Sequence, residues 1–106
     1  MTMRAVLLLA AGLLLASLAP ARAHMPYLAC ARQGDVVRCK GGFTGGRSVA
    51  GVRIDVVADD GAVLIEGVFD AGSSFTFSPP AQGYYVLLDA GPGHTIEVDD
   101  QDVVDP

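Results

Sequence analysis

The sequence has little of the chemistry that enzymes and nucleic-acid-binding proteins need. Only two of its 106 residues are histidines, only two are cysteines, and its seven basic side chains are outnumbered by twelve acidic ones. The acidic excess excludes nucleic acid as a partner and disfavours anionic lipid, because phosphate contacts need clustered positive charge. Neither histidine has an evident serine partner for a Ser–His–acid grouping. We therefore expect a protein that is not an enzyme.

The longest apolar run lies at the start of the chain. Residues 5–19 are almost wholly apolar, follow a basic start with Arg4, and precede Pro20 and the small residues Ala21 and Ala23. This is the pattern of a secretory signal peptide. At about 15 residues, the run is shorter than the roughly 20 that a membrane-spanning helix needs. We assign 1–23 as a signal-peptide helix and expect a periplasmic or secreted protein with no membrane span after processing.

The position of the cleavage decides which residue becomes the new N-terminus. A cut after Ala23 leaves His24 first, and a cut after Ala21 leaves Arg22 first. The spacing from the apolar run favours the cut after Ala23, although both sites have the required small residues. Removing 23 residues from 106 leaves 83, enough for one domain with a modest core. Five basic and twelve acidic groups then give a net charge near −7.

The two cysteines, Cys30 and Cys39, both lie beyond the expected signal peptide. Exported chains meet an oxidising compartment, so we predict a disulfide that joins the two strands of a hairpin. The alternative is a pair of thiolate metal ligands. The spacing of nine is wider than in the C-x₂₋₄-C units of zinc sites, and the sequence has no second such pair.

Beyond residue 23 the sequence is a series of short strands and turns without any helical period. The glycine-rich residues 41–46 predict a loop, and the continuously apolar residues 84–89 predict a central strand. The expected strands are 27–32, 36–40, 52–57, 63–69, 74–78, 84–89 and 95–98. They predict an all-β fold, a single antiparallel seven-stranded β-sandwich of transthyretin-like or immunoglobulin-like type over 24–98. The acidic residues 99–106 predict a disordered tail.

A particular order of motifs occupies about half of the chain. Ala50-Gly51-Val52, Asp60-Gly61, Asp70, Phe75-Thr76-Phe77, Pro79 and Tyr85-Val86 follow one another. From Val49 to Val98 this order resembles the carboxypeptidase regulatory-like, or transthyretin-like, domain family. The resemblance implies a seven-stranded β-sandwich that serves as a structural or binding module. One departure is Ser73, because the family commonly has glycine two residues before the first phenylalanine.

A second resemblance concerns the whole of the expected mature chain. It combines the initial His-Met-Pro-Tyr of 24–27, the cysteine pair, and Gly-Pro-Gly-His at 91–94. This pattern is similar to small periplasmic proteins of Gram-negative bacteria, and related exported β domains accompany some nickel and cobalt uptake systems. The resemblance implies metal handling, with an exported or inner-membrane transport protein as a partner.

The two histidines are the one feature that points to specific chemistry. If His24 is the processed N-terminus, its amine and ring Nδ1 can chelate a metal ion, and His94 can add a third nitrogen. Three nitrogens in a T-shape form the histidine brace of copper proteins, and nitrogen-rich tetragonal sites favour Cu(II) or Ni(II). Met25 adds a thioether that suits Cu(I). We predict a copper or nickel site made of His24, Met25 and His94.

Three functions remain open at this point. The first is a periplasmic copper or nickel carrier that uses His24 and His94. The second is a non-catalytic structural or interaction module, in which both histidines are ordinary surface residues. The third is a small copper-dependent redox enzyme. A calcium site at Asp59-Asp60 and Asp99-Asp100 would require these two acidic turns to converge in space.

Overall fold

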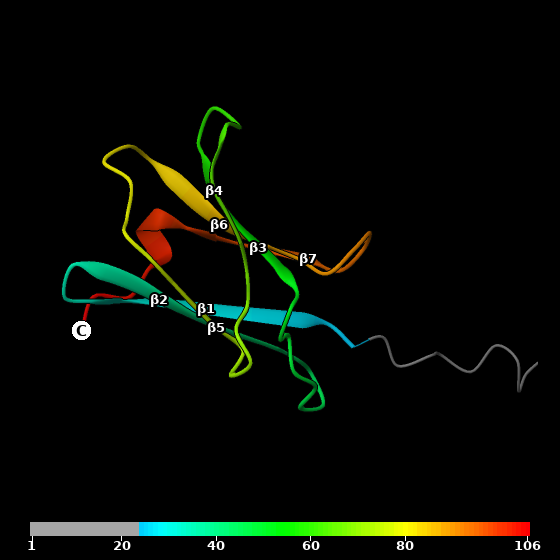
Figure 1. The fold of residues 1–106 in the computed structure, drawn as a ribbon. Coiled ribbons are helices and arrows are strands. Elements are labelled where there is room, and N and C mark those ends of the chain that lie inside the picture. Colours follow the sequence, from blue (N-terminus) through cyan, green and yellow to red (C-terminus); the bar gives the residue numbers. More distant parts are fainter. Residues whose placement is uncertain (1–23) are drawn as a thin grey trace, which may run out of the picture.

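The computed structural model describes residues 24–106, so the expected signal peptide, residues 1–23, lies outside the described residues. Seven antiparallel strands form two sheets, and a short 3₁₀ helix follows the last strand (Figure 1). The strands are β1 (Pro26–Gln33), β2 (Val36–Phe43), β3 (Arg53–Ala58), β4 (Val63–Val68), β5 (Ser74–Phe77), β6 (Tyr84–Asp89) and β7 (Thr95–Asp99), and the helix is η1 (Asp100–Asp102). The predicted all-β class is confirmed, and the two sheets are consistent with a β-sandwich.

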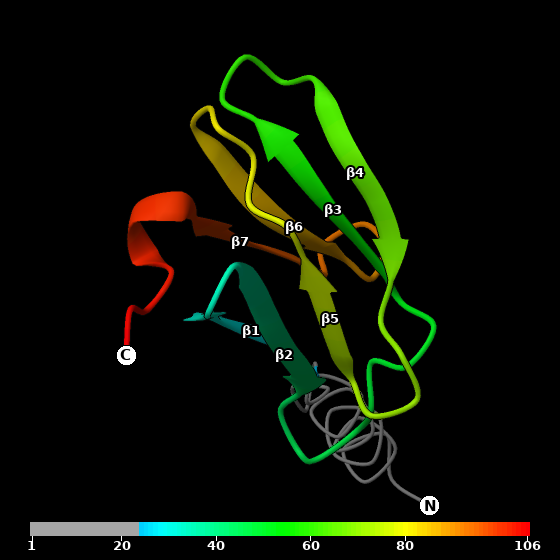
Figure 2. The same ribbon diagram turned by 60° about the vertical axis from the view of Figure 1, so that its left-hand side comes forward.

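The first sheet has the order β1-β2-β5 and the second the order β4-β3-β6-β7 (Figure 2). β6 lies between β3 and β7, so residues 84–89 form a central strand, as the sequence predicted. Along β6 the buried Tyr84, Val86 and Leu88 alternate with partly exposed residues, which is the period of a strand with one face in the core. Both sheets contribute to one core, which includes Val37, Cys39, Ile54, Val56, Val86 and Leu88.

The predicted disulfide is present. Cys30 and Cys39 lie opposite each other on β1 and β2 and are bonded, and both are buried. Neither sulfur is therefore a free thiolate that could bind a metal ion. Within residues 24–106, no helix is long and apolar enough to cross a membrane.

The glycine-rich segment 41–46 is a loop only in its second half, because β2 continues to Phe43. A Cβ on Gly41 would lie 3.0 Å from the ring of Phe69 and 3.0 Å from a methyl group of Val49. The neighbouring side chains thus occupy the space that a side chain at this position would need. Glycine has a low intrinsic propensity for β-strands, and tertiary packing keeps Gly41 in β2 despite it.

We expect Gly41→Ala to lower the free energy of unfolding by about 1–3 kcal/mol, because the added methyl overpacks the core. Urea unfolding followed by circular dichroism measures this loss. In a Phe69→Leu background the loss should be smaller, since the shorter side chain leaves room for the methyl. An equal loss in both backgrounds would show that Phe69 does not crowd this position.

Residues 99–106 differ from the disordered tail that the sequence predicted. Asp100–Asp102 form η1, and Val104 then bonds to β1: Arg32 N donates to Val104 O at 2.8 Å, and Val104 N donates to Cys30 O at 3.0 Å. These bonds satisfy backbone groups on the edge of β1, which explains why the segment is ordered. β1 and β7 also contact each other, so the first and last strands lie side by side. His24 and His94, which precede these strands, line the same hollow, so both strands begin at the same end of the sheets.

The β4–β5 turn contains Ser73, which adopts a backbone conformation that glycine usually supplies. Ser73 has a φ of 60°, the left-handed region that favours glycine, and it is the one such non-glycine residue among those described. Its Oγ accepts a hydrogen bond from Val49 N at 3.1 Å and contacts Ser48 Oγ at 2.9 Å. Serine thus adopts the conformation expected of glycine, and its side chain ties this turn to the loop between β2 and β3.

Candidate functional site

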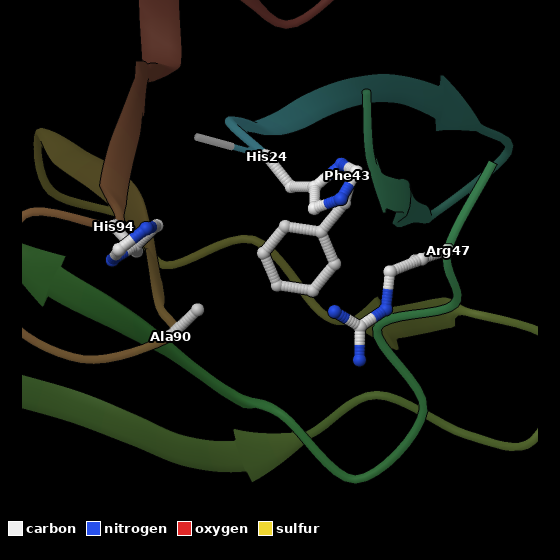
Figure 3. A pocket seen from close by; sticks show the side chains of 5 residues that line it. All are labelled: His24, Phe43, Arg47, Ala90 and His94. Carbon is white, nitrogen blue, oxygen red and sulfur yellow. The ribbon is translucent and has the colours of Figure 1, made fainter. Parts of the chain in front are cut away.

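A hollow of about 270 Å³ lies at one end of the two sheets, and both histidines line it. Its lining residues are His24, Phe43, Arg47, Ala90 and His94 (Figure 3). They come from the chain just before β1, from the end of β2 and the loop after it, and from the two ends of the β6–β7 turn. Because β1 and β7 begin at the same end, two histidines that are far apart in the sequence lie at one site.

The loop after β2 holds the ring of His24. Nδ1 of His24 lies 2.9 Å from the carbonyl oxygen of Thr44. A carbonyl only accepts, so Nδ1 carries the hydrogen, and Nε2 of the neutral ring has the free lone pair. Thr44 also anchors Met25, because Met25 N donates to Thr44 Oγ1 at 3.1 Å and Thr44 N donates to Met25 O at 2.9 Å. The ring lies beside Gly45, whose φ of 94° disfavours any larger residue.

The turn between β6 and β7 holds the ring of His94. Ala90 N donates to His94 O at 3.0 Å, and His94 N donates to Gly91 O at 2.9 Å. Nδ1 of His94 lies 3.2 Å from the carbonyl oxygen of Pro92, so here too Nδ1 carries the hydrogen and Nε2 the lone pair. A backbone carbonyl on one ring nitrogen is the arrangement that orients metal-binding histidines and raises the basicity of the other nitrogen.

The opposite walls of the hollow differ in chemistry. Figure 3 shows His94 and Ala90 on one side, and His24, Phe43 and Arg47 on the other. No acidic side chain lines the hollow. Among residues 24–106, no group of three His, Cys, Asp or Glu side chains is arranged to hold a metal ion. A metal ion here would therefore have two imidazoles and would take its remaining ligands from elsewhere.

The structure brings together two of the three predicted ligands. His24 and His94 line the hollow, whereas the half-exposed Met25 does not. The predicted chelate through the amine and Nδ1 of His24 would require the ring to release the carbonyl of Thr44. In the observed orientation, Nε2 is the atom available to a ligand.

Phe43 and Arg47 were not predicted as site residues. The signal that identifies them is the register of the first hairpin, in which Cys30 lies opposite Cys39. Continued by five residues, this register places Met25 opposite Thr44, and hence the Phe43–Arg47 loop beside the start of the chain. The glycine-rich sequence of 41–46 predicts an irregular loop, which hides this continuation of the register.

The acidic turns do approach each other but form no metal site. A Cβ on Gly83 would overlap the carboxylate of Asp59 and lie 3.8 Å from Asp100 Oδ2. A hydrogen bond between the Asp99 and Asp100 side chains lowers the pKa of Asp99 and raises the pKa of Asp100. With no third ligating side chain among the described residues, calcium binding gains no support.

Comparisons of the chain with protein-family models, curated proteins and solved structures found no match. The chemistry available at the hollow is therefore that of its own side chains. These are two imidazoles with free Nε2 atoms, one guanidinium, an aromatic ring and a methyl group.

Proposed function

We propose that the protein is an exported binding protein for a divalent metal ion, copper or nickel, with His24 and His94 as its imidazole ligands. The observation that supports this is their shared geometry: both rings line one hollow, and both have Nδ1 on a backbone carbonyl. Their Nε2 atoms are the imidazole donors that suit copper and nickel, and affinity among divalent ions is highest for copper.

We infer that the protein functions in the periplasm. The disulfide supports an oxidising compartment, and the apolar start of the chain supports export. Cleavage after Ala23 would free the amine of His24 beside the hollow, where it can add a further nitrogen ligand. The two sheets, which we infer to form a transthyretin-like sandwich, hold the two histidines on a rigid frame. An exported or inner-membrane transport protein is then the receiver of the metal.

The alternative, a non-catalytic interaction module, is favoured by one observation. β4 is an edge strand, and Val63, Leu64 and Val68 on it are 47, 36 and 59% exposed. An apolar edge with unpaired backbone groups can take up a strand from another chain.

A copper redox enzyme would need the histidine site as well, and no observation favours catalysis over binding there.

If the protein binds metal, its processed form, in which His24 is the first residue, should become much more stable when the metal is added. Cu(II) or Ni(II) at a hundred times its Kd should add about 2.7 kcal/mol if it binds only the folded state. For a domain of this size, that raises Tm by about 10–20 °C. His94→Ala should remove most of the rise, because it deletes one of the two imidazoles. Differential scanning calorimetry with and without metal makes the measurement.

Met25→Ala is the matched control, because Met25 neighbours His24 but lies outside the hollow. It should keep the full metal-induced rise. A rise that persists in both His24→Ala and His94→Ala would refute the site, and the absence of any rise in the unaltered protein would favour the interaction module. The intact mass of the secreted protein reports whether His24 is its first residue.

A further inference from the structure

The hollow contains a cation of its own, which is unexpected in a site for a bare metal dication. Arg47 lines it, and no aspartate or glutamate does. The other three arginines of residues 24–106, Arg32, Arg38 and Arg53, each have an acidic or hydroxyl side-chain partner. In this part of the chain the guanidinium of Arg47 has no such partner. Its planar fork of N–H donors matches a carboxylate, which it can bind through two parallel hydrogen bonds.

The size of the hollow points to the same kind of ligand. Its volume of about 270 Å³ is far larger than the roughly 10–15 Å³ that a cavity needs to hold one water. His94 lies on one side, with His24 and Arg47 on the other (Figure 3). A metal ion bound by both imidazoles would leave space in the hollow for further ligands. The ring of Phe43 and the methyl of Ala90 add apolar wall suited to a short carbon skeleton.

Building on the metal-binding function proposed above, we propose that the hollow binds the metal more tightly as a complex with a small polycarboxylate than as a bare ion. The imidazoles of His24 and His94 are metal ligands, and carboxylate oxygens of the chelator complete the coordination that the protein leaves open. Arg47 binds a carboxylate of the chelator. This inference rests on the proposed function and adds the class of the bound complex.

The charges favour the complex over the free ion. A dication is repelled by the nearby guanidinium of Arg47, whereas a neutral or negative metal–carboxylate complex is attracted to it. The chain as a whole is acidic, with a formal net charge of −5. Among the described residues that line the hollow, the one charged side chain is basic, which is a local reversal of sign. It disfavours adventitious cations and retains those that arrive with their own carboxylates.

Equilibrium dialysis with Ni(II) and radiolabelled citrate in equal amounts tests this inference. The unaltered protein should retain nickel and citrate together in a 1:1 ratio. Arg47→Gln should retain at least about tenfold less citrate, because it loses the charge-assisted bidentate contact. Arg38→Gln is the matched control: it removes the same charge from the outer face of β2, away from the hollow, and should behave like the unaltered protein. The Tm of each metal-free variant checks its folding, and the exposed Arg47 side chain should be dispensable for it.

The outcomes separate this inference from the proposed function. Nickel retained without citrate by the unaltered protein overturns the inference but leaves metal binding intact. Citrate retained equally well without nickel overturns it too, because the hollow would then be a simple anion site. If the unaltered protein retains neither nickel nor citrate, both proposals are refuted. Arg47→Gln that retains citrate as the unaltered protein does would exclude Arg47 from the site.

Discussion

Replacing Phe69 by alanine is expected to lower the free energy of unfolding by about 3–5 kcal/mol, the largest effect of any single substitution considered for this chain. Phe69 is the largest fully buried side chain among the described residues, at 2% exposure. It lies just after β4, where its backbone bonds to Gly51 and Val52, and its ring covers Gly41 in the other sheet. Alanine would leave a cavity between the sheets that they can close only in part.

Urea unfolding monitored by circular dichroism measures this loss. Phe69→Leu keeps most of the buried volume and should lose less than half as much. Tyr27→Ala is the control for removing an aromatic ring outside the core, because Tyr27 is 51% exposed. Folded domains are stable by only about 5–15 kcal/mol, so Phe69→Ala should remove a large share of the total. A loss below about 1 kcal/mol would show that the ring does not join the two sheets.

Removing the disulfide with the double substitution Cys30→Ala and Cys39→Ala should cost about 2–5 kcal/mol. The disulfide closes a loop with a sequence separation of nine. This lowers the conformational entropy of the unfolded chain and so stabilises the folded state by about 2.6 kcal/mol. Both sulfurs are also buried in the core, at 3% and 0% exposure, so their loss leaves unfilled volume. Chemical denaturation of the oxidised, reduced and doubly substituted proteins compares the three states.

The single substitutions provide the control for this prediction. Each single variant breaks the same covalent bond, so Cys30→Ala and Cys39→Ala should each lose nearly as much stability as the double variant. Strictly additive losses would indicate that the two sulfurs act through separate packing contacts. A reduced protein as stable as the oxidised one would mean that the bond does not stabilise the fold. The β1–β2 pairing that places His24 beside Thr44 should be less stable in all three variants.

Most of the strands were predictable because their signals are local. The continuous apolar run of 84–89 predicted a central strand, and β6 lies between β3 and β7. β3 follows its local signal less closely, because the polar Asp55 is also buried, at 3% exposure, beside Arg53, whose Nε donates to Asp55 Oδ2 at 2.9 Å.

The incorrect predictions concern residues whose structure depends on distant neighbours. Gly41 has low strand propensity, yet the packing of Phe69 and Val49 around it keeps it in β2. The acidic tail has no apolar pattern, yet Val104 bonds to the exposed edge of β1. In both cases tertiary contacts override the local preference, and no window of sequence contains the two partners.

The sequence by itself determined the all-β class, the number and approximate bounds of the strands, and the pairing of Cys30 with Cys39. These follow from local periodicity, turn residues and the spacing of one hairpin. Only the tertiary structure decided that His24 and His94 line one hollow together with Arg47. That arrangement depends on the first and last strands lying side by side in different sheets. The contacts responsible join residues at opposite ends of the described chain, where periodicity and spacing give no information.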